Sequence, residues 1–232
     1  MPPRISSLLI ASFLSIYITA CGSGGGGTGA DETTEVQVSE VKANYAAMAR
    51  AAYSDSLTTA QELEAAVTVF LADPTEANLD LAKAAYKATR IPYQQSEIMR
   101  WDTVITIDHD LAADGGPASV DDWEGQVNAW PLDESFIVSI IEGTDPITTA
   151  LLLAQNGASG NEANVTTGVH AVEFMLWGAD TNGVGPGAGQ RPATDFANDG
   201  SCADAFCERR GQYLRVATAL LVADLTAMAA EW

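Results

Sequence analysis

The sequence YLRVATALLVADLTAMAAEW, residues 213–232, carries the clearest structural signal in the chain. Its large apolar side chains recur at intervals of three and four positions, which places them on one face of an α-helix. The stripe consists of Tyr213, Ala217, Leu220, Leu221, Leu225, Met228 and Trp232. We therefore predict that the chain ends in a long helix that buries one face.

Segments further upstream show the same helical spacing. Apolar positions begin near residue 36 and resume at 63–71 after a polar stretch at 54–59. The triplet Asp73-Pro74-Thr75 is predicted to end this helix and to cap the next. The second helix continues to Pro92, where we expect a kink or a restart, and then to about residue 101.

The rest of the chain is predicted to hold shorter helices and irregular connections. The connections cover 102–130 and the Gly/Pro-rich stretch 178–200. No period-two run, hairpin signal or internal repeat is present. We therefore predict an all-α fold, an up-and-down bundle of four or five long helices over residues 36–232. The shorter helices are expected at 132–142, 147–155 and 165–177.

The N-terminal residues resemble an export signal. Residues 1–20 combine Arg4, an apolar run too short for a resident transmembrane helix, and small residues directly before Cys21. This pattern predicts a bacterial lipoprotein, with Cys21 lipidated and residues 21–35 acting as a flexible tether. The alternative is an ordinary cleaved signal followed by a chance cysteine. Gly22 after the cysteine favours the outer membrane, so we expect a lipid-anchored protein of the cell envelope.

Charge and cysteine content restrict the partners. The formal net charge is −20, which argues against nucleic acid and against an anionic membrane surface as partners. If Cys21 carries lipid, Cys202 and Cys207 remain as one pair in an oxidising compartment, and we predict a disulfide between them. A pair of metal ligands is the alternative, although no histidine lies nearby in the sequence.

Only two histidines are present, His109 and His170. No zinc-protease motif, nucleophile elbow or phosphate-binding loop accompanies them. His170 and Glu173 are three residues apart, so on a helix both could reach one cation from the same side. The same spacing also suits a satisfied structural pair. Gly168 would let a helix or a ligand approach closely, whereas Trp130, Trp177 and Trp232 are interpreted as packing residues.

Four motifs in order resemble the imelysin family, also called peptidase family M75. The first is the Gly-x-His-x-x-Glu pattern beginning at Gly168. The others are an Arg-x-Pro-Tyr-x-x-x-Glu segment containing Arg90, Tyr93, Gln94 and Glu97, the stretch 128–134, and the run 191–214. Together they cover about residues 40–232.

The resemblance implies a fold of two related helical bundles, of which this chain would be the first or a short form. It also implies further metal ligands, which correspond to Glu97 and Asp108, although Gln94 stands where metal-binding relatives have an acid. One imidazole and three carboxylates suit iron, and also zinc or another divalent metal.

The function we expect is that of a non-catalytic envelope lipoprotein that binds iron, or an iron-containing ligand such as haem, for uptake by an iron-transport component. The alternative is an M75-type metallopeptidase. A third hypothesis is a scaffold without a ligand, in which His170 and Glu173 satisfy one another.

Overall fold

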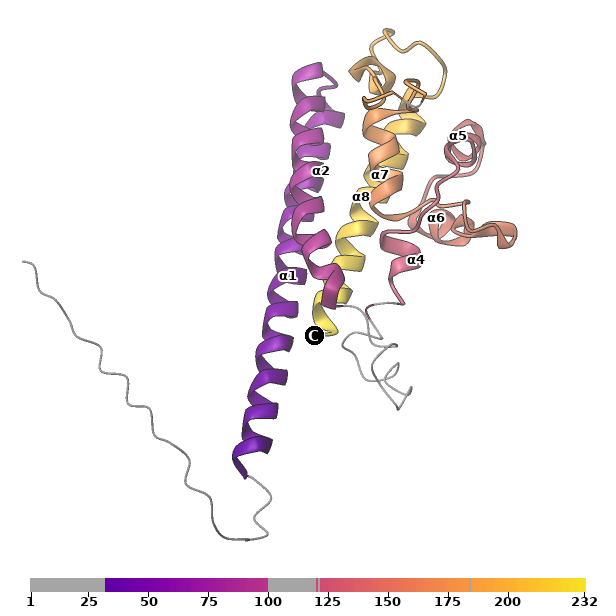
Figure 1. Ribbon diagram of the computed structural model, residues 1–232. Helices are drawn as coiled ribbons and strands as arrows, with labels where there is room; N and C mark the ends of the chain where they lie inside the picture. Colours follow the sequence, from indigo (N-terminus) through magenta and orange to yellow (C-terminus); the bar gives the residue numbers. More distant parts are fainter. Residues whose placement is uncertain (1–31, 100–119, 121, 184) are drawn as a thin grey trace, which may run out of the picture.

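The structure is a computed structural model that describes residues 32–99, 120, 122–183 and 185–232, with side chains from residue 37 onward (Figure 1). It is all-α, as predicted, since the described residues contain no strand. The predicted signal peptide, Cys21, the predicted tether up to residue 31 and Asp108 lie outside these ranges.

Three long helices form the body of the molecule. They are α1 (Glu32–Ala72), α2 (Glu76–Ser96) and α8 (Cys207–Ala230). A short turn reverses the chain between α1 and α2, and the Thr75 hydroxyl caps α2 by accepting a hydrogen bond from the Asn78 N–H. Helix α8 packs along α1, and α7 (Gly168–Trp177) packs on α8 and α2 (Figure 1). We expected four or five long helices, whereas the described body has three and a shorter fourth.

The remaining elements are short, and α4, α5 and α6 among them lie beside the α7–α8 pair (Figure 1). They connect the long helices and bring loops to the start and end of α7. These elements are η1 (Glu97–Met99), α4 (Glu124–Val127), α5 (Glu134–Glu142), α6 (Thr149–Gln155), η2 (Ala158–Gly160) and η3 (Ala193–Phe196).

Helix α1 continues through the polar stretch at 54–59. Ser56, Thr58 and Thr59 each donate their hydroxyl to the carbonyl four residues earlier, at 2.9–3.0 Å. Hydroxyls bonded in this way stay within the helix and need no other partner. A polar interruption of the apolar pattern therefore did not mean an interruption of the helix.

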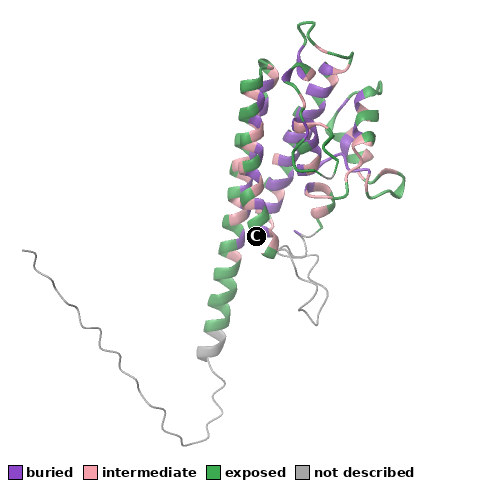
Figure 2. Ribbon diagram, turned by 45° about the horizontal axis from the view of Figure 1, so that its top comes forward, coloured by how far each residue is buried: buried purple, intermediate pink, exposed green. Residues whose placement is uncertain are grey.

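The first part of α1 is helical but largely exposed (Figure 2). Val41 is 68% exposed and Met48 is 55% exposed. The apolar spacing predicted the helix correctly but gave no indication that this stretch lacks a covering element in the described part of the chain. Burial begins at Ala49 and Tyr53, where α1 meets the rest of the body.

Two boundaries differ from the sequence prediction. Helix α2 passes through Pro92 to Ser96 without a restart, and the 3₁₀ turn η1 follows it directly. Helix α7 begins at Gly168, not at residue 165, because Thr167 has an extended backbone and the two residues before it are buried outside the helix. The Thr166 carbonyl accepts a hydrogen bond from the Tyr213 hydroxyl, at 2.7 Å, instead of starting a helix.

Helix α8 supplies the centre of the core. Tyr213, Leu214, Leu221 and Leu225 are completely buried. The helix is long and apolar enough to cross a membrane by composition alone, but half of its most apolar window is buried within the molecule. Its contacts with α1 and α7 therefore identify it as a core helix.

Candidate functional site

The start of α7 is held by a close contact that requires glycine at position 168. Gly168 has φ +75°, and a Cβ there would meet the carbonyl oxygens of Gln126, at 2.6 Å, and Val127. The hydroxyl of Thr167 donates to the same Gln126 carbonyl at 2.7 Å. A side chain at 168 would therefore strain the backbone and push α4 away from α7.

Helix α4 is also tied to α8 by a buried carboxylate. Asp224 accepts a hydrogen bond from the Gln126 side-chain amide, at 2.7 Å, and is only 4% exposed. Its second oxygen, Oδ2, is buried without a hydrogen-bond partner. Burial raises the pKa of Asp224 to about 6, and the bond from Gln126 opposes that shift only in part.

The motif residues His170 and Glu173 face one another on α7. Nδ1 of His170 lies 3.2 Å from a carboxylate oxygen of Glu173. The histidine side chain is 18% exposed and that of the glutamate is 49% exposed. The hydrogen bond from His170 is the main cause that lowers the pKa of Glu173, against an opposing effect of burial. Nδ1 is thus engaged, while Nε2 has no hydrogen bond among the described residues.

Tyr86 of α2 lies on the other side of Glu173. The tyrosine is 4% exposed, and its hydroxyl is buried without a hydrogen bond of ordinary geometry. Burial and the nearby negative charge of Glu173 both raise the pKa of this phenol. Its ring packs edge-on against Trp177, with 5.3 Å between ring centroids. Tyr86 therefore places a buried hydroxyl beside the motif carboxylate, where it helps to lower the pKa of Glu173 without making a hydrogen bond of ordinary geometry.

Two hollows meet at His170. The first has a volume of about 400 Å³, and its lining includes Tyr86, Glu173 and Trp177. The second, of about 510 Å³, is lined by polar side chains that include Arg90, Glu124 and Asn128. Both hollows contain His170 in their walls.

Trp130 also belongs to both hollows and is not the packing residue that we expected. It is 70% exposed, and its ring lies 5.0 Å from the His170 ring at an angle of 56°. We call His170, Glu173, Tyr86 and Trp130 the His170 junction. Its members are brought together from α2, α7 and the loop after α4.

The Arg90–Glu97 segment forms a separate polar network around Asn128. Arg90 donates to the Asn128 side-chain oxygen at 2.9 Å, and Asn128 donates to Glu124 at 2.6 Å and to Glu97 at 3.5 Å. Tyr93 donates its hydroxyl to Glu124 at 3.0 Å. The Arg90 guanidinium is thus directed to Asn128.

The four predicted ligands are not assembled in the described part of the chain. His170 and Glu173 are in contact, whereas Glu97 lies in the Asn128 network and Asp108 falls outside the described ranges. Within those ranges, no third His, Cys, Asp or Glu donor atom lies within 4.8 Å of both motif residues. Gln94 is exposed on α2.

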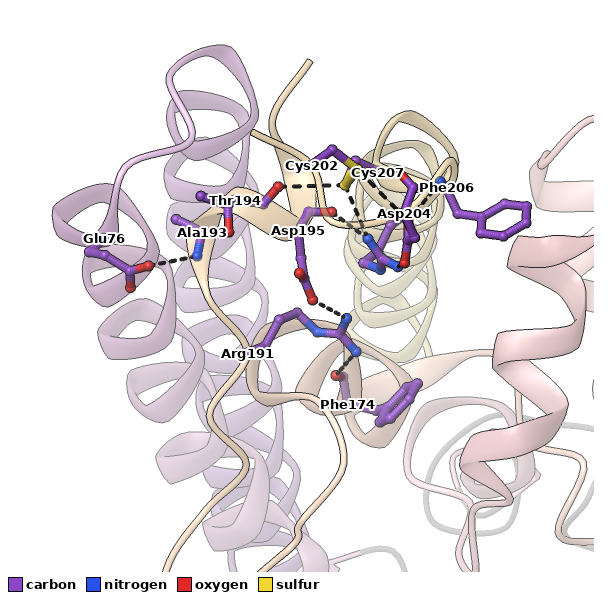
Figure 3. A network of polar contacts seen from close by, with 11 residues as sticks. Glu76, Phe174, Arg191, Ala193, Thr194, Asp195, Cys202, Asp204, Phe206 and Cys207 are labelled. Carbon is purple, nitrogen blue, oxygen red and sulfur yellow. Dashed lines mark hydrogen bonds and ion pairs between the residues drawn. A yellow bond between two sulfur atoms is a disulfide. The ribbon is translucent and has the colours of Figure 1, made fainter. Parts of the chain in front are cut away.

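A second polar cluster, which we call the arginine corner, joins η3 to the start of α8 (Figure 3). It consists of Arg191, Asp195, Asp204 and Arg210 with the cysteine pair. Arg191 contacts Asp195 at 3.2 Å, and Arg210 donates to the Asp195 carbonyl at 2.6 Å and to the Asp204 carboxylate at 2.7 Å. Burial, with repulsion from Arg210, lowers the pKa of Arg191.

Cys202 and Cys207 are joined by a disulfide beside this corner. With Asp204 they form the single group of three metal-type donors found in the described residues. A disulfide has no free thiolate, however, so the oxidised pair is a covalent staple and not a metal site. The neighbouring Arg209 donates to three carbonyls at and after the end of α5 and so caps that helix.

Comparison with known proteins identifies the family. The family model described as Imelysin, peptidase M75, matches residues 49–232. This chain belongs to the imelysin family. The matched region contains the His170 junction, the Asn128 network and the arginine corner.

A solved structure shows the same fold. The protein, from Parabacteroides distasonis, is named "putative iron-regulated protein A precursor". It superposes with a TM-score of 0.54 at 20% identity, over 80% of this chain and 44% of its own. The imelysin chain described here thus spans less than half of that relative's length. No curated protein matches the chain.

The sequence interpretation missed three residues of the site: Tyr86, Glu124 and Asn128. Glu124 and Asn128 are spaced four apart, as helix neighbours are, but α4 is so short that no periodicity marks it. Asn128 begins a family-like motif, which was a usable signal. Tyr86 looked like one more member of the apolar stripe of α2, and nothing in the sequence distinguished its hydroxyl.

Proposed function

We propose that this imelysin-family protein binds iron in the bacterial cell envelope and acts in its uptake as a binding protein, not as an enzyme. The observation that carries the proposal is the pairing of His170 with Glu173 at the meeting point of two hollows. An imidazole nitrogen and a carboxylate oxygen lie 3.2 Å apart at the wall of the first hollow, so both could bind one cation there. The name of the structural relative, which refers to iron regulation, supports the same role.

The donors present suit iron chemically. An imidazole nitrogen with carboxylate oxygens is a set that iron accepts, and zinc or another divalent cation would compete for it. Glu124 lines the second hollow with His170, and Glu97 borders it through Asn128, so both are carboxylates within the same region. Asp108 remains a proposed ligand from the family resemblance. Haem is the alternative, larger iron-containing ligand.

Metal content and affinity of purified protein test this proposal. Replacing His170 or Glu173 by alanine should each weaken iron binding by about tenfold or more, if direct ligands matter at least as much as the residues that orient them. Thermal stability without metal should change much less, because both side chains are partly exposed. The matched control is Glu142→Ala, an exposed carboxylate that ends α5 and lines neither hollow.

Two results would contradict the iron proposal. The first is an iron affinity in His170→Ala equal to that of the wild type. The second is a large loss of stability in both variants with unaltered metal binding, which would make the pair structural. Affinity should also fall in acid, because a protonated imidazole cannot bind a metal.

The envelope location has its own experiment. We propose that lipidated Cys21 anchors the protein to the outer membrane and that residues up to about 35 let the helical domain reach a transport component. Cells that express the full chain should show it in the detergent phase after phase partitioning. Cys21→Ser should move it to the aqueous phase or leave it unprocessed. Equal partitioning of both proteins would contradict the anchor.

A further inference from the structure

We propose that Tyr86 is a third ligand of the site, and that its phenolate oxygen makes the site prefer ferric iron to divalent cations. This inference rests on the proposed iron function and adds a residue and an oxidation state to it. The juxtaposition that carries it is a buried, unpaired hydroxyl on α2 beside the motif carboxylate on α7, at the wall of the first hollow.

The unpaired hydroxyl is unusual for a buried tyrosine. Polar groups that leave water normally regain a hydrogen bond inside the protein, and an orphaned one needs an explanation. Tyr213 is also buried, and it follows this rule because its hydroxyl donates to the Thr166 carbonyl. Tyr86 is 4% exposed and makes no hydrogen bond of ordinary geometry, although Glu173 lies beside it and both line a hollow of about 400 Å³. A ligand in that hollow would supply the missing interaction.

The position beside Glu173 indicates which ligand this is. Both groups line the first hollow, and the negative charge of Glu173 acts on the phenol. A cation bound by Glu173 and His170 would therefore lie within the same group of donors. Phenolate and carboxylate are both hard anionic oxygens, the kind of donor that a small, highly charged cation prefers.

The binding step balances in protons and charge. The O–H bond of Tyr86 breaks, an oxygen–iron bond forms, and the proton leaves to solvent through the open hollow. Phenolate and carboxylate then offset two of the three charges of Fe³⁺. A divalent ion competes less well for the proton of a buried phenol, because its attraction for the phenolate is weaker. The preference for ferric iron follows from this difference.

The test is a spectroscopic titration of the purified protein. Ferric iron, supplied as its nitrilotriacetate complex, should give a phenolate-to-iron absorption band in the visible range. Tyr86→Phe should abolish the band and weaken ferric binding by about tenfold or more. It should change zinc and manganese binding by no more than about threefold. The phenylalanine keeps the ring packing against Trp177. The matched control is Tyr53→Phe, a buried tyrosine that lines neither hollow and should leave the band unchanged.

The outcomes separate this inference from the iron proposal. If wild-type protein binds no iron, or if iron binding does not require His170, the proposed function fails. If iron binds through His170 but the complex is colourless, or if Tyr86→Phe keeps the band and the affinity, then the tyrosine inference alone is wrong. Resonance Raman spectra of the wild-type ferric protein should show phenolate vibrations. Their absence would overturn the inference even if the phenylalanine variant did not fold.

Discussion

The arginine corner and the His170 junction are both conspicuous polar regions, but they differ in how their groups are paired. In the corner, Arg210 donates to a carbonyl and a carboxylate. Arg191 contacts Asp195 (Figure 3), and its Nε is the one buried atom of the corner without a partner among the described residues, but it lines neither hollow at His170. In the junction, Nε2 of His170 and the hydroxyl of Tyr86 have no such partners in the described part of the chain.

This difference distinguishes two roles that the residues of a family-like motif can have, a structural role and a ligand-binding role. Groups that satisfy one another hold the fold together, whereas groups left open at the wall of a hollow are available to a ligand. Both regions lie inside the segment that matches the imelysin family. Membership of the family therefore does not indicate which of the two regions binds a ligand. The hydrogen bonding of their polar groups does.

The largest effect on stability is expected in the corner, from Arg210→Ala. The side chain is buried, so its removal leaves the Asp195 carbonyl and the Asp204 carboxylate without their donor. Breaking such a pair costs about 3 kcal/mol, somewhat less than for a fully buried pair because Asp204 is partly exposed. Urea unfolding should show this loss, while iron affinity per folded molecule stays unchanged.

Arg215→Ala is the matched control for this prediction. Arg215 lies on the same helix but is exposed, so its loss should change the free energy of unfolding by less than about 0.5 kcal/mol. A reduced iron affinity in folded Arg210→Ala would show that the corner and the junction are not independent, and the comparison would then fail.

A smaller effect, in the opposite direction, is expected from Asp224→Asn beneath the junction. The folded protein raises the pKa of Asp224 from 3.8 to about 6. The stability linked to its protonation is therefore present below pH 3.8 and lost as the pH rises through about 6. An uncharged asparagine avoids this loss, so the variant should be about 2 kcal/mol more stable at pH 7.

The pH dependence distinguishes this explanation from a change in packing. The advantage of Asp224→Asn over the wild type should shrink as the pH is lowered from 7 towards 4, because the wild-type carboxyl becomes neutral as well. Thermal unfolding at several pH values measures it. A variant that is less stable than the wild type at pH 7 would mean that the charge of Asp224 is needed to hold Gln126.

Much of the fold could be predicted because its signal is local. The stripe from Tyr213 to Trp232 predicted α8, and Thr75 predicted the start of α2, since both depend on residues within a few positions. The exposure of Val41 could not be predicted in this way. A helical pattern shows which face is apolar, but whether another element covers that face depends on residues far away in the chain.

In the site, too, local contacts could be predicted and contacts between distant residues could not. The contact between His170 and Glu173 follows from helix geometry, and it was predicted. The partner of Glu97 lies 31 residues away at Asn128, so it depends on how α4 docks on α2. The missing partner of the Tyr86 hydroxyl is a property of the packed structure alone. Sequence patterns identify polar residues but do not tell which of them the fold leaves unpaired.

Removal of the disulfide should have a moderate effect, again confined to the corner. The cysteines are separated by five positions, and the chain-entropy relation for so short a loop gives about 2 kcal/mol. The double variant Cys202→Ser/Cys207→Ser should lose about this much in urea unfolding and keep its iron affinity. Mass spectrometry of unreduced wild-type protein should find the pair two hydrogens lighter. A drop in iron affinity would instead show that the corner and the junction are not independent.

The smallest effect on stability is expected from Glu173→Gln in the junction. The hydrogen bond from His170 lowers the pKa of Glu173, so its contribution to stability is present above the unfolded value of 4.5 and is lost as the pH falls through the lower folded value. The side chain is 49% exposed, and solvent screens the pair to less than about 0.5 kcal/mol.

The same substitution removes a proposed anionic ligand while glutamine can still bond to His170, so iron affinity should fall by about tenfold. Asp204→Asn is the corresponding experiment in the corner. Burial raises the pKa of the Asp204 carboxylate, but the Phe206 N–H and Arg210 lower it by more, so that this pKa is also lowered overall. Asp204→Asn should lower stability more than Glu173→Gln does and leave affinity unchanged. If both variants instead lose stability and keep their affinity, the His170–Glu173 pair has the same structural role as the arginine corner, and the iron site lies elsewhere.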